Sequence, residues 1–470
     1  MRPIRFLLDN QLIEVADIDP TTTVLEWLRY TASRTGTKEG CAEGDCGACT
    51  VVVGELKGDN VTWRAVNACI LFMPMLDGKA LVTVESLGGD HPVQKAMVEL
   101  HGSQCGFCTP GIIMSLYGRS LGATGTCGVA PKDVLAGNLC RCTGYGPIIA
   151  AADANPATDI DDSDLVAKLQ ALTTEPLDLI HSTGRWTSPR TLDQLAQALL
   201  DRPNARIVAG ATDVGLWVTK QNRPLTDIIS IGEVAELTKI TQTDDGVTLG
   251  AGVRYSDAHD VLTDLHKDLG ELIRRIGAVQ VRNSGTIGGN IANGSPIGDM
   301  PPALIALGAT LTLRRGNDRR TLPLEDYFIA YGQQDRQRGE FVESVFIPYT
   351  DDFVRIVKLS KRFDSDISAV CAAVRLHIDD DTIVSARVAF GGMAGTPKRA
   401  LAVEAALTGQ PYDDATFEAA AQAVARDFQP LTDVRGSSDY RLTVAANLIR
   451  DLWRKPRAVL DVKPIEVDHA

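Results

Sequence analysis

Apolar and polar residues alternate from the first residues of the chain. In residues 2–15 two apolar runs lie on either side of Asp9-Asn10, and this pattern predicts a β-hairpin. Thr22 or Thr23 precedes the amphipathic stretch VLEWLRY, which predicts a short capped helix. Later runs that are rich in apolar and β-branched residues predict strands at residues 50–53, 65–71 and 80–84. This order of strand, turn and helix is typical of a small β-grasp domain.

Helical periodicity replaces this alternation after residue 91. Apolar residues spaced at helical intervals predict helices at residues 92–100, 111–120 and 131–139, which together suggest a compact helical module over residues 91–150. The composition then shifts to Asp, Ala, Thr and Pro in the stretch ADANPATDIDDSD. We expect an exposed connector and a domain boundary between residues 151 and 175.

Strands and helices then alternate to the end of the chain. The pattern predicts a helix at residues 192–200, followed by strands at residues 205–209, 227–231 and 247–251. A further unit, with a strand at 384–390 and helices at 416–427 and 439–454, is predicted from about residue 353 onward. The predicted fold class is therefore multidomain α+β.

Composition narrows the class of protein. The 470 residues allow about three domains, and a net charge of −13 argues against broad contact with nucleic acid or anionic lipid. The first residues do not resemble a signal peptide, and no run of about 18 apolar residues follows. We therefore expect a soluble, cytoplasmic protein. In that reducing compartment, ten cysteines indicate metal or redox chemistry more than disulfides.

The first cysteine set is Cys41, Cys46 and Cys49, in the spacing C-x4-C-x2-C, followed by Cys69. This is the plant-type ferredoxin arrangement for a [2Fe–2S] cluster, in which each iron takes two thiolates and two bridging sulfides. Glycines at positions 40, 44 and 47 let the loop bend and bring backbone N–H groups to the sulfurs. The alternatives are buried reduced thiols or a zinc knuckle, but zinc sites usually come as paired C-x2-C units.

The second set consists of two close pairs in the stretches GSQCGFCTPG and NLCRCTGYG, namely Cys105, Cys108, Cys140 and Cys142. Ligands one residue apart fit a two-iron cluster better than a tetrahedral site for a single ion, although zinc remains the main competitor on spacing alone. Cys127 lies in a Gly- and Thr-rich turn and Cys371 in an apolar run, so we interpret both as structural.

A plant-type cluster loop followed by QCGFCTPG and CRCTGY resembles the iron–sulfur half of the molybdenum hydroxylases, which include the xanthine dehydrogenase, aldehyde oxidoreductase and carbon monoxide dehydrogenase families. The resemblance implies that Cys105, Cys108, Cys140 and Cys142 hold a second [2Fe–2S] cluster. It also places Gln104 at the glutamine that approaches the molybdenum pterin, a role that Gln104 would fill only across an interface.

Two later segments, IVAGATDVG and NSGTIGGNIANGSPIGD, resemble the FAD-binding segments of the same family. Free N–H groups and small side chains at the end of a strand suit a pyrophosphate. Many members of the family that the chain resembles have a glycine where this chain has Ala211. Neither segment is G-x-G-x-x-G, so the resemblance implies the vanillyl-alcohol-oxidase type of FAD domain and not a Rossmann fold. The implied FAD-binding residues are Ile207, Val208, Ala209, Gly210, Ala211, Thr212, Asp213, Val214, Gly215, Ser284, Thr286, Gly288, Gly289, Asn290, Asp299 and, as a weaker candidate, Lys361.

The resemblance implies a domain order for the whole chain. We expect a ferredoxin-like β-grasp [2Fe–2S] domain at residues 1–88, a helical [2Fe–2S] domain at 89–152, a linker at 153–178, an FAD domain at 179–350 and a C-terminal α+β domain at 351–470. No residue is predicted to be catalytic, because substrate oxidation would occur at molybdopterin-bound molybdenum on a separate large subunit. Two-subunit xanthine dehydrogenases suggest an (αβ)₂ heterotetramer.

In the family's scheme, electrons pass from molybdenum through the Cys105 set and the Cys41 set to FAD and then to NAD⁺. Hypoxanthine and xanthine are the substrates that the closest resemblance implies. Three alternatives remain: an aldehyde or N-heterocycle hydroxylase of the same type, a stand-alone electron carrier or redox sensor, and a zinc-stabilised binding module.

Overall fold

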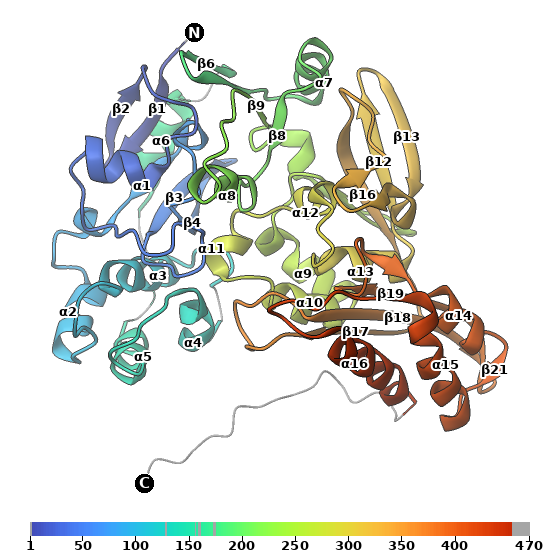
Figure 1. Cartoon of the computed structure of the whole chain (residues 1–470). Coiled ribbons are helices and arrows are strands. Elements are labelled where there is room, and N and C mark those ends of the chain that lie inside the picture. Colours follow the sequence, from blue (N-terminus) through green and yellow to red (C-terminus); the bar gives the residue numbers. More distant parts are fainter. Residues whose placement is uncertain (1, 127–128, 156, 158–160, 173–174, 454–470) are drawn as a thin grey trace.

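The computed structural model describes the chain except for residues 1, 127–128, 156, 158–160, 173–174 and 454–470 (Figure 1). Cys127 and the end of the helix predicted at residues 439–454 lie outside the described residues. Within the described residues, no helix is long and apolar enough to cross a membrane.

The N-terminal region forms the predicted β-grasp sheet. The strands have the order β2-β1-β5-β3-β4, and the β1–β2 turn places Asp9 and Asn10 at positive φ. Thr23 caps the short helix as predicted, because its side chain accepts a hydrogen bond from the Glu26 backbone N–H. The elements are β1 (Ile4–Leu8), β2 (Gln11–Val15), α1 (Val24–Glu26), a π-helical turn (Trp27–Thr31), β3 (Thr50–Lys57), β4 (Asn60–Asn67), 3₁₀ turns (Met73–Leu76 and Val84–Leu87) and β5 (Ala80–Val82).

A helical region follows and lies below this sheet in Figure 1, with α3 packed against β3. Its central helix α3 is almost entirely buried, and Ile112 and Leu116 pack in one core with Val52 of β3. The helix predicted at residues 131–139 is shorter than expected, because a 3₁₀ turn replaces it before the cysteine pair. The elements are α2 (Pro92–Glu99), α3 (Thr109–Ser120), α4 (Pro131–Val134), a 3₁₀ turn (Leu135–Gly137) and α5 (Gly146–Asp153).

The connector expected between residues 151 and 175 is not wholly irregular. It contains helix α6 (Ser163–Leu172), whose Leu165 and Leu169 are buried against the N-terminal sheet. Asp162, just before the helix, accepts a hydrogen bond from the Trp63 indole N–H at 3.1 Å. The polar composition of this segment concealed two apolar positions one helical turn apart, and these are sufficient to dock a short amphipathic helix.

The central region, residues 177–348, contains two main sheets and the two-stranded sheet β14-β15. The smaller has the order β6-β7-β9-β8 and the larger the order β10-β11-β16-β12-β13. Helices α9 to α13 fill the space between the larger sheet and the rest of the molecule (Figure 1). The elements are β6 (Leu177–His181), β7 (Gly184–Ser188), α7 (Leu192–Asp201), β8 (Arg206–Val208), α8 (Val214–Thr219), β9 (Asp227–Ser230), β10 (Ile240–Gln242), β11 (Gly246–Gly250), α9 (Tyr255–Leu265), α10 (Lys267–Arg274), α11 (Val279–Arg282), α12 (Ile287–Asn293), α13 (Met300–Leu307), β12 (Thr310–Arg315), β13 (Asp318–Pro323), β14 (Phe328–Ala330), β15 (Gln333–Gln334) and β16 (Phe341–Pro348), with 3₁₀ turns at Ala235–Thr238 and Leu324–Tyr327.

The C-terminal region is an antiparallel sheet covered by helices. Helix α13 of the central region packs against β18 and β19, so the two regions share a layer. Helices α14 to α16 cover the sheet with a separate apolar core that includes Phe390 and Phe417. The elements are β17 (Phe353–Leu359), β18 (Val370–Asp379), β19 (Thr382–Gly391), β20 (Lys398–Arg399), α14 (Leu401–Leu407), β21 (Gln410–Pro411), α15 (Asp414–Asp427) and α16 (Ser438–Asp451).

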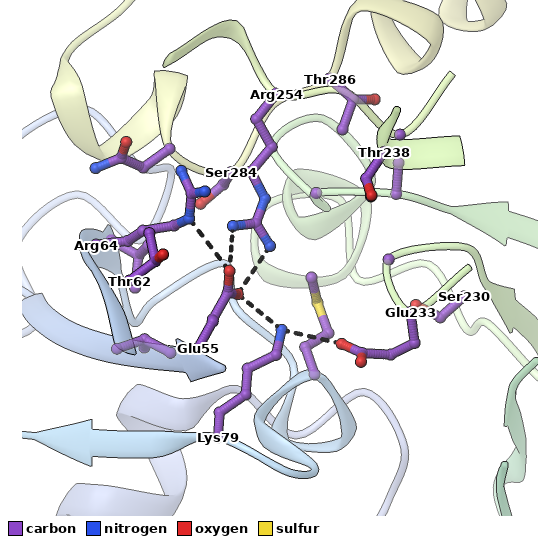
Figure 2. Close-up of a pocket in the computed structure, with 18 of the residues that line it drawn as sticks. Glu55, Thr62, Arg64, Lys79, Ser230, Glu233, Thr238, Arg254, Ser284 and Thr286 are labelled. Carbon is purple, nitrogen blue, oxygen red and sulfur yellow. Dashed lines mark hydrogen bonds and ion pairs between the residues drawn. The ribbon is translucent and has the colours of Figure 1, made fainter. Parts of the chain in front are cut away.

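An ion network joins the N-terminal and central regions around a cavity of about 700 Å³ (Figure 2). The Glu55 carboxylate lies at the centre of the ion network and contacts Arg254 at 2.6 Å, Lys79 at 3.0 Å and Arg64 at 3.2 Å. Lys79 also contacts Glu233 at 3.2 Å. Burial by itself would raise the pKa of Glu55, but the cations at Arg254, Lys79 and Arg64 lower that pKa well below its usual value. The carboxylate therefore holds three cations from two regions together.

We predict that Glu55→Gln lowers the free energy of unfolding by roughly 3 kcal/mol at pH 7, because three cations lose their shared counter-charge. Since the pKa of Glu55 is lower in the folded than in the unfolded state, this contribution is present above the unfolded pKa of about 4.5 and is lost as the pH falls through the folded pKa. Urea unfolding of the unmodified protein and of Glu55→Gln, from pH 7 down to the lowest pH at which both are folded, measures the difference in their free energies of unfolding.

Glu14→Gln is the control, because Glu14 is half exposed and, among the described residues, pairs with Arg5 alone. This substitution should change stability by less than about 1 kcal/mol. A Glu55→Gln effect no larger than that of Glu14→Gln, or one that does not shrink in acid, would contradict the prediction.

Candidate cofactor sites

The first cysteine loop is held by its own backbone. The Cys41 sulfur accepts backbone N–H hydrogen bonds from Glu43, Asp45 and Cys46 at 3.3–3.4 Å, and the Cys46 sulfur accepts one from Cys41 at 3.3 Å. Gly44 and Gly47 have φ values of +77° and +66°, a conformation that glycine adopts without strain. The loop bends as the glycine pattern predicted, and its N–H groups point at sulfur.

Hydrogen bonds connect the four thiols of this set in the order Cys46, Cys41, Cys69 and Cys49. The pKa of Cys41 is lowered because Cys46 and Cys69 donate hydrogen bonds to its sulfur, whereas the pKa of Cys69 is raised because it donates to Cys41 and Cys49. Cys49 and Cys69 are buried, and Cys41 and Cys46 are partly exposed. Such linked pairs fit a cluster in which each of two irons takes two thiolates.

The second set forms two pairs. Hydrogen bonds join Cys105 to Cys142 and Cys108 to Cys140. Burial and the neighbouring Cys140 raise the pKa of Cys108 to about 12. Cys105 and Cys142 are exposed, as are the neighbouring residues Gln104 and Phe107. In the described part of the chain, no three His, Cys, Asp or Glu side chains surround a point that suits a single metal ion.

Backbone contacts bring the two cysteine sets together. The Leu139 N–H, adjacent to Cys140, donates to the Cys46 carbonyl at 2.9 Å. Gly47 lies so close to Gly137 that a Cβ on Gly47 would stand 2.0 Å from the Gly137 carbonyl oxygen. These glycines therefore allow the two loops to approach more closely than side chains would permit.

The two segments expected to bind FAD meet in the central region. Ile207 and Val208 end β8, residues 209–213 form the following turn, and Val214 and Gly215 begin α8. The Thr286 hydroxyl caps α12 by accepting from Gly289 N–H at 2.9 Å. A Cβ on Gly210 would stand 1.6 Å from the Ser284 carbonyl oxygen, so the two segments are in backbone contact at this glycine.

The first segment offers backbone donors. Within the described residues, no N–H from Gly210 to Asp213 donates to another protein group. Ala211 has a φ of +59°, a backbone conformation that glycine adopts more readily than alanine. Burial raises the pKa of Asp213, whose side chain bonds to Trp217 and to Asn293 of α12. Free N–H groups beside small residues fit a pyrophosphate, and Asp213 ties this segment to the second.

In the second segment, Gly288 packs directly on Ala251, and the buried Asn290 side-chain oxygen has no hydrogen-bond partner among the described residues. Asp299 begins α13 and is buried, and its carboxylate contacts Lys358 at 2.5 Å and the Ser368 hydroxyl. The structure therefore joins the two predicted FAD segments at Gly210 and Ser284 and at Asp213 and Asn293, and it places Asp299 against Lys358 and Ser368.

Lys361 lies elsewhere. It is exposed, and its ammonium donates to the Val434 carbonyl at 2.6 Å. The lysine beside Asp299 is Lys358, which sequence reasoning missed. Its signal was present in the alternation of β17, where Val354, Ile356 and Lys358 all occupy inward positions.

Helix α8 links the first flavin segment to the first cysteine loop. A Cβ on Gly215 would stand 2.8 Å from the Cβ of Ile70, the residue after Cys69. The Thr219 hydroxyl donates to the Ala42 carbonyl at 2.7 Å, next to Cys41. The structure thus has a spatial order: second cysteine set, first cysteine set, flavin segments.

Four family models match consecutive parts of the chain. They are described as a 2Fe-2S iron-sulfur cluster binding domain at residues 6–73, a [2Fe-2S] binding domain at 83–153, an FAD binding domain in molybdopterin dehydrogenase at 181–350, and a CO dehydrogenase flavoprotein C-terminal domain at 355–455. The first two models contain the two cysteine sets, and the third contains both flavin segments.

Curated relatives extend the match. Xanthine dehydrogenase of Emericella nidulans is 29% identical over 99% of this chain and 40% of its own length. Xanthine dehydrogenase of Oryza sativa subsp. japonica is 32% identical over 84% of this chain and 36% of its own length. The chain therefore spans about two fifths of the length of these relatives.

Solved structures resemble part of the chain. A chain of carbon monoxide dehydrogenase from Hydrogenophaga pseudoflava matches with a TM-score of 0.54 and 27% identity, over 56% of this chain and 94% of that one. A chain of quinoline 2-oxidoreductase from Pseudomonas putida 86 matches with a TM-score of 0.53 and 26% identity, over 57% and 94%. With its cysteine sets and flavin segments arranged in this way, the chain belongs to the molybdenum hydroxylase family, of which it carries two [2Fe–2S] domains and the FAD-binding domain.

Proposed function

We propose that this chain carries electrons from a molybdenum centre on a partner chain through two [2Fe–2S] clusters to FAD, and on to NAD⁺, as the iron–sulfur and flavin part of a xanthine dehydrogenase. The observation that carries the proposal is the spatial order of the three sites. Leu139 joins the second cysteine set to the first, and α8 joins the first set to the flavin segments. The order begins at the exposed Cys105 on the surface of the protein and ends at the flavin segments.

The residues that would hold each group are those brought together by the fold. Cys41, Cys46, Cys49 and Cys69 would hold the first cluster, and Cys105, Cys108, Cys140 and Cys142 the second. The N–H groups of residues 210–213, with Thr286, Asn290 and Asp299, would hold FAD. When bound, these groups supply one-electron transfer and flavin hydride chemistry.

The protein's own part is to position the groups and tune their potentials. Three N–H donors on the Cys41 sulfur stabilise negative charge there, and so favour the reduced cluster. No acid or base for substrate oxidation is assigned to this chain.

A molybdopterin-binding large subunit would approach the second cysteine set. Cys105 and Cys142 are exposed, and Phe107 and Leu139 beside them are 48% and 47% exposed, although both are large and apolar. Such a surface around a redox site suits a protein partner. We propose an (αβ)₂ heterotetramer in the cytoplasm, with Gln104 facing the partner.

Substrate choice would belong to that partner. The relatives named xanthine dehydrogenase favour hypoxanthine and xanthine, with urate as the product. The resemblance to quinoline 2-oxidoreductase favours an N-heterocycle hydroxylase as the second candidate. Co-purifying the partner from the native host and assaying xanthine against quinoline and an aldehyde would decide among them.

The proposed acceptor can be tested on the chain alone. We predict that anaerobic addition of NADH bleaches the visible absorbance of the purified, cofactor-loaded protein, because hydride transfer to FAD is reversible. Dithionite gives the full extent of bleaching for comparison. If dithionite bleaches the protein and NADH does not, NAD⁺ is not the acceptor.

Cys69→Ser should remove half of the bound iron, because one thiolate of the first cluster is lost and the second cluster keeps all four of its own. Cys371→Ser is the matched control: Cys371 is also buried, 1% exposed against 2% for Cys69, but it lies in β18, where its thiol donates to the Asp299 carbonyl at 3.6 Å. Iron analysis of both variants measures the effect. Full iron in Cys69→Ser, or lost iron in Cys371→Ser, would contradict the assignment.

Gly210→Ala should weaken FAD binding at least about ten-fold, because the new methyl group overlaps the Ser284 carbonyl and pushes the two segments apart. Gly232→Ala is the control in the same region, where the new Cβ would meet only the Ser230 hydroxyl at 3.9 Å. Flavin release on dilution, followed by fluorescence, compares the two variants. Equal flavin retention would show that FAD does not use this contact.

A further inference from the structure

Gln280 of α11 reaches out of the central region into the contact between the two cysteine sets. The residue is only 1% exposed. Its side-chain amide nitrogen lies 3.1 Å from the Ser115 hydroxyl, 3.2 Å from the Thr50 hydroxyl and 3.2 Å from the Asn138 amide oxygen. Asn138 Oδ1 can only accept, so the Gln280 atom that faces these three groups must be the N–H₂ donor.

The partners of Gln280 bond to the Gly47 carbonyl group, either directly or through Asn138. Ser115 donates to Asn138 at 2.7 Å, and Asn138 donates to the Gly47 carbonyl at 3.1 Å. The Thr50 hydroxyl donates to the same carbonyl at 2.7 Å, and the Thr50 N–H donates to it at 3.1 Å. Gly47 lies between Cys46 and Cys49, so three donors fix one peptide of the first cluster loop.

The same residues lie against the second cysteine set. Ser115 is on α3, which starts directly after Cys108, and Asn138 precedes Cys140 by two positions. A Cβ on Gly137 would stand 2.3 Å from the Gln280 amide oxygen, and one on Gly111 would stand 2.2 Å from the Gly47 carbonyl oxygen. Gln280 therefore packs directly on the turn before Cys140, and the first cysteine loop packs directly on the start of α3.

We propose that Gln280 is a positioning residue that fixes the first iron–sulfur loop against the second and thereby sets the geometry between the two clusters. This inference rests on the proposed function, because it concerns the step between the clusters. A residue of the central region would then affect electron transfer between the two clusters, a step in which the FAD of that region takes no part.

The test uses Gln280→Met in the full, cofactor-loaded protein. Methionine keeps the length of the side chain and removes the amide donor. The readout is the spin–spin splitting between the two clusters in the EPR spectrum of the fully reduced protein, because this splitting depends steeply on their distance and orientation. We expect a measurably altered splitting, with iron and FAD contents equal to those of the unmodified protein.

Asn283→Leu is the matched control. Asn283 ends α11, is also 1% exposed, and also crosses from the central to the N-terminal region, where its amide donates to the Ala65 carbonyl at 3.0 Å. Its contact is with β4, and the Ala65 carbonyl belongs to neither cysteine loop. We expect this variant to keep the splitting of the unmodified protein even where its thermal midpoint falls.

An unchanged splitting in Gln280→Met, or the same change in Asn283→Leu, would overturn the inference. If Gln280→Met does not retain iron, Thr50→Val removes the acceptor and donor at the other end of the same network, and it must alter the splitting in its place. An unmodified protein without two [2Fe–2S] signals would instead refute the proposed function, before any variant is made.

Discussion

The structure depends on one close backbone contact, between the loop that carries Cys46 and Cys49 and the turn that precedes Cys140. Gly47, Gly111 and Gly137 meet there without side chains, and the Leu139 N–H donates to the Cys46 carbonyl. Any Cβ at these positions would force the loops apart. The β-grasp and helical domains share an apolar core, and at this contact the missing side chains let the two loops approach closely. The polar groups buried beside the contact bond largely to one another and to the Gln280 amide nitrogen, whereas the Gln280 amide oxygen has no hydrogen-bond partner among the described residues.

The central region is attached to this pair of domains in three chemically different ways. Helix α8 packs on Ile70 and bonds to Ala42, Gln280 bonds to Ser115, Thr50 and Asn138, and Arg254 pairs with Glu55. The first attachment brings the flavin segments to the first cysteine loop, and the second is buried between the two loops. The third lies farther along β3, where the charges line a cavity (Figure 2). The central region is therefore held at three separate places on the iron–sulfur domains.

Short-range sequence patterns predicted much of the fold. The two cysteine spacings, the Asp9-Asn10 hairpin and the Thr23 cap are short-range patterns, and the structure has the hairpin and the cap as expected. Helix α6 was missed because only Leu165 and Leu169 mark its buried face within a polar stretch. The predicted helix at residues 131–139 ended early because the chain must turn to present Cys140. Lys358 was not considered as a candidate, because nothing in the sequence alone shows that Asp299 faces β17. Gln280 carried no sequence signal, since its partners come from three distant segments.

The most direct test of the central claim is a count of iron, zinc and flavin in the purified chain, with a visible absorption spectrum of the same sample. The account predicts iron sufficient for two [2Fe–2S] clusters, one FAD per chain, and a spectrum that contains both iron–sulfur and flavin bands. Zinc in place of iron, with a colourless and flavin-free protein, would contradict it, because the cysteine sets would then be structural sites and the flavin segments ordinary turns.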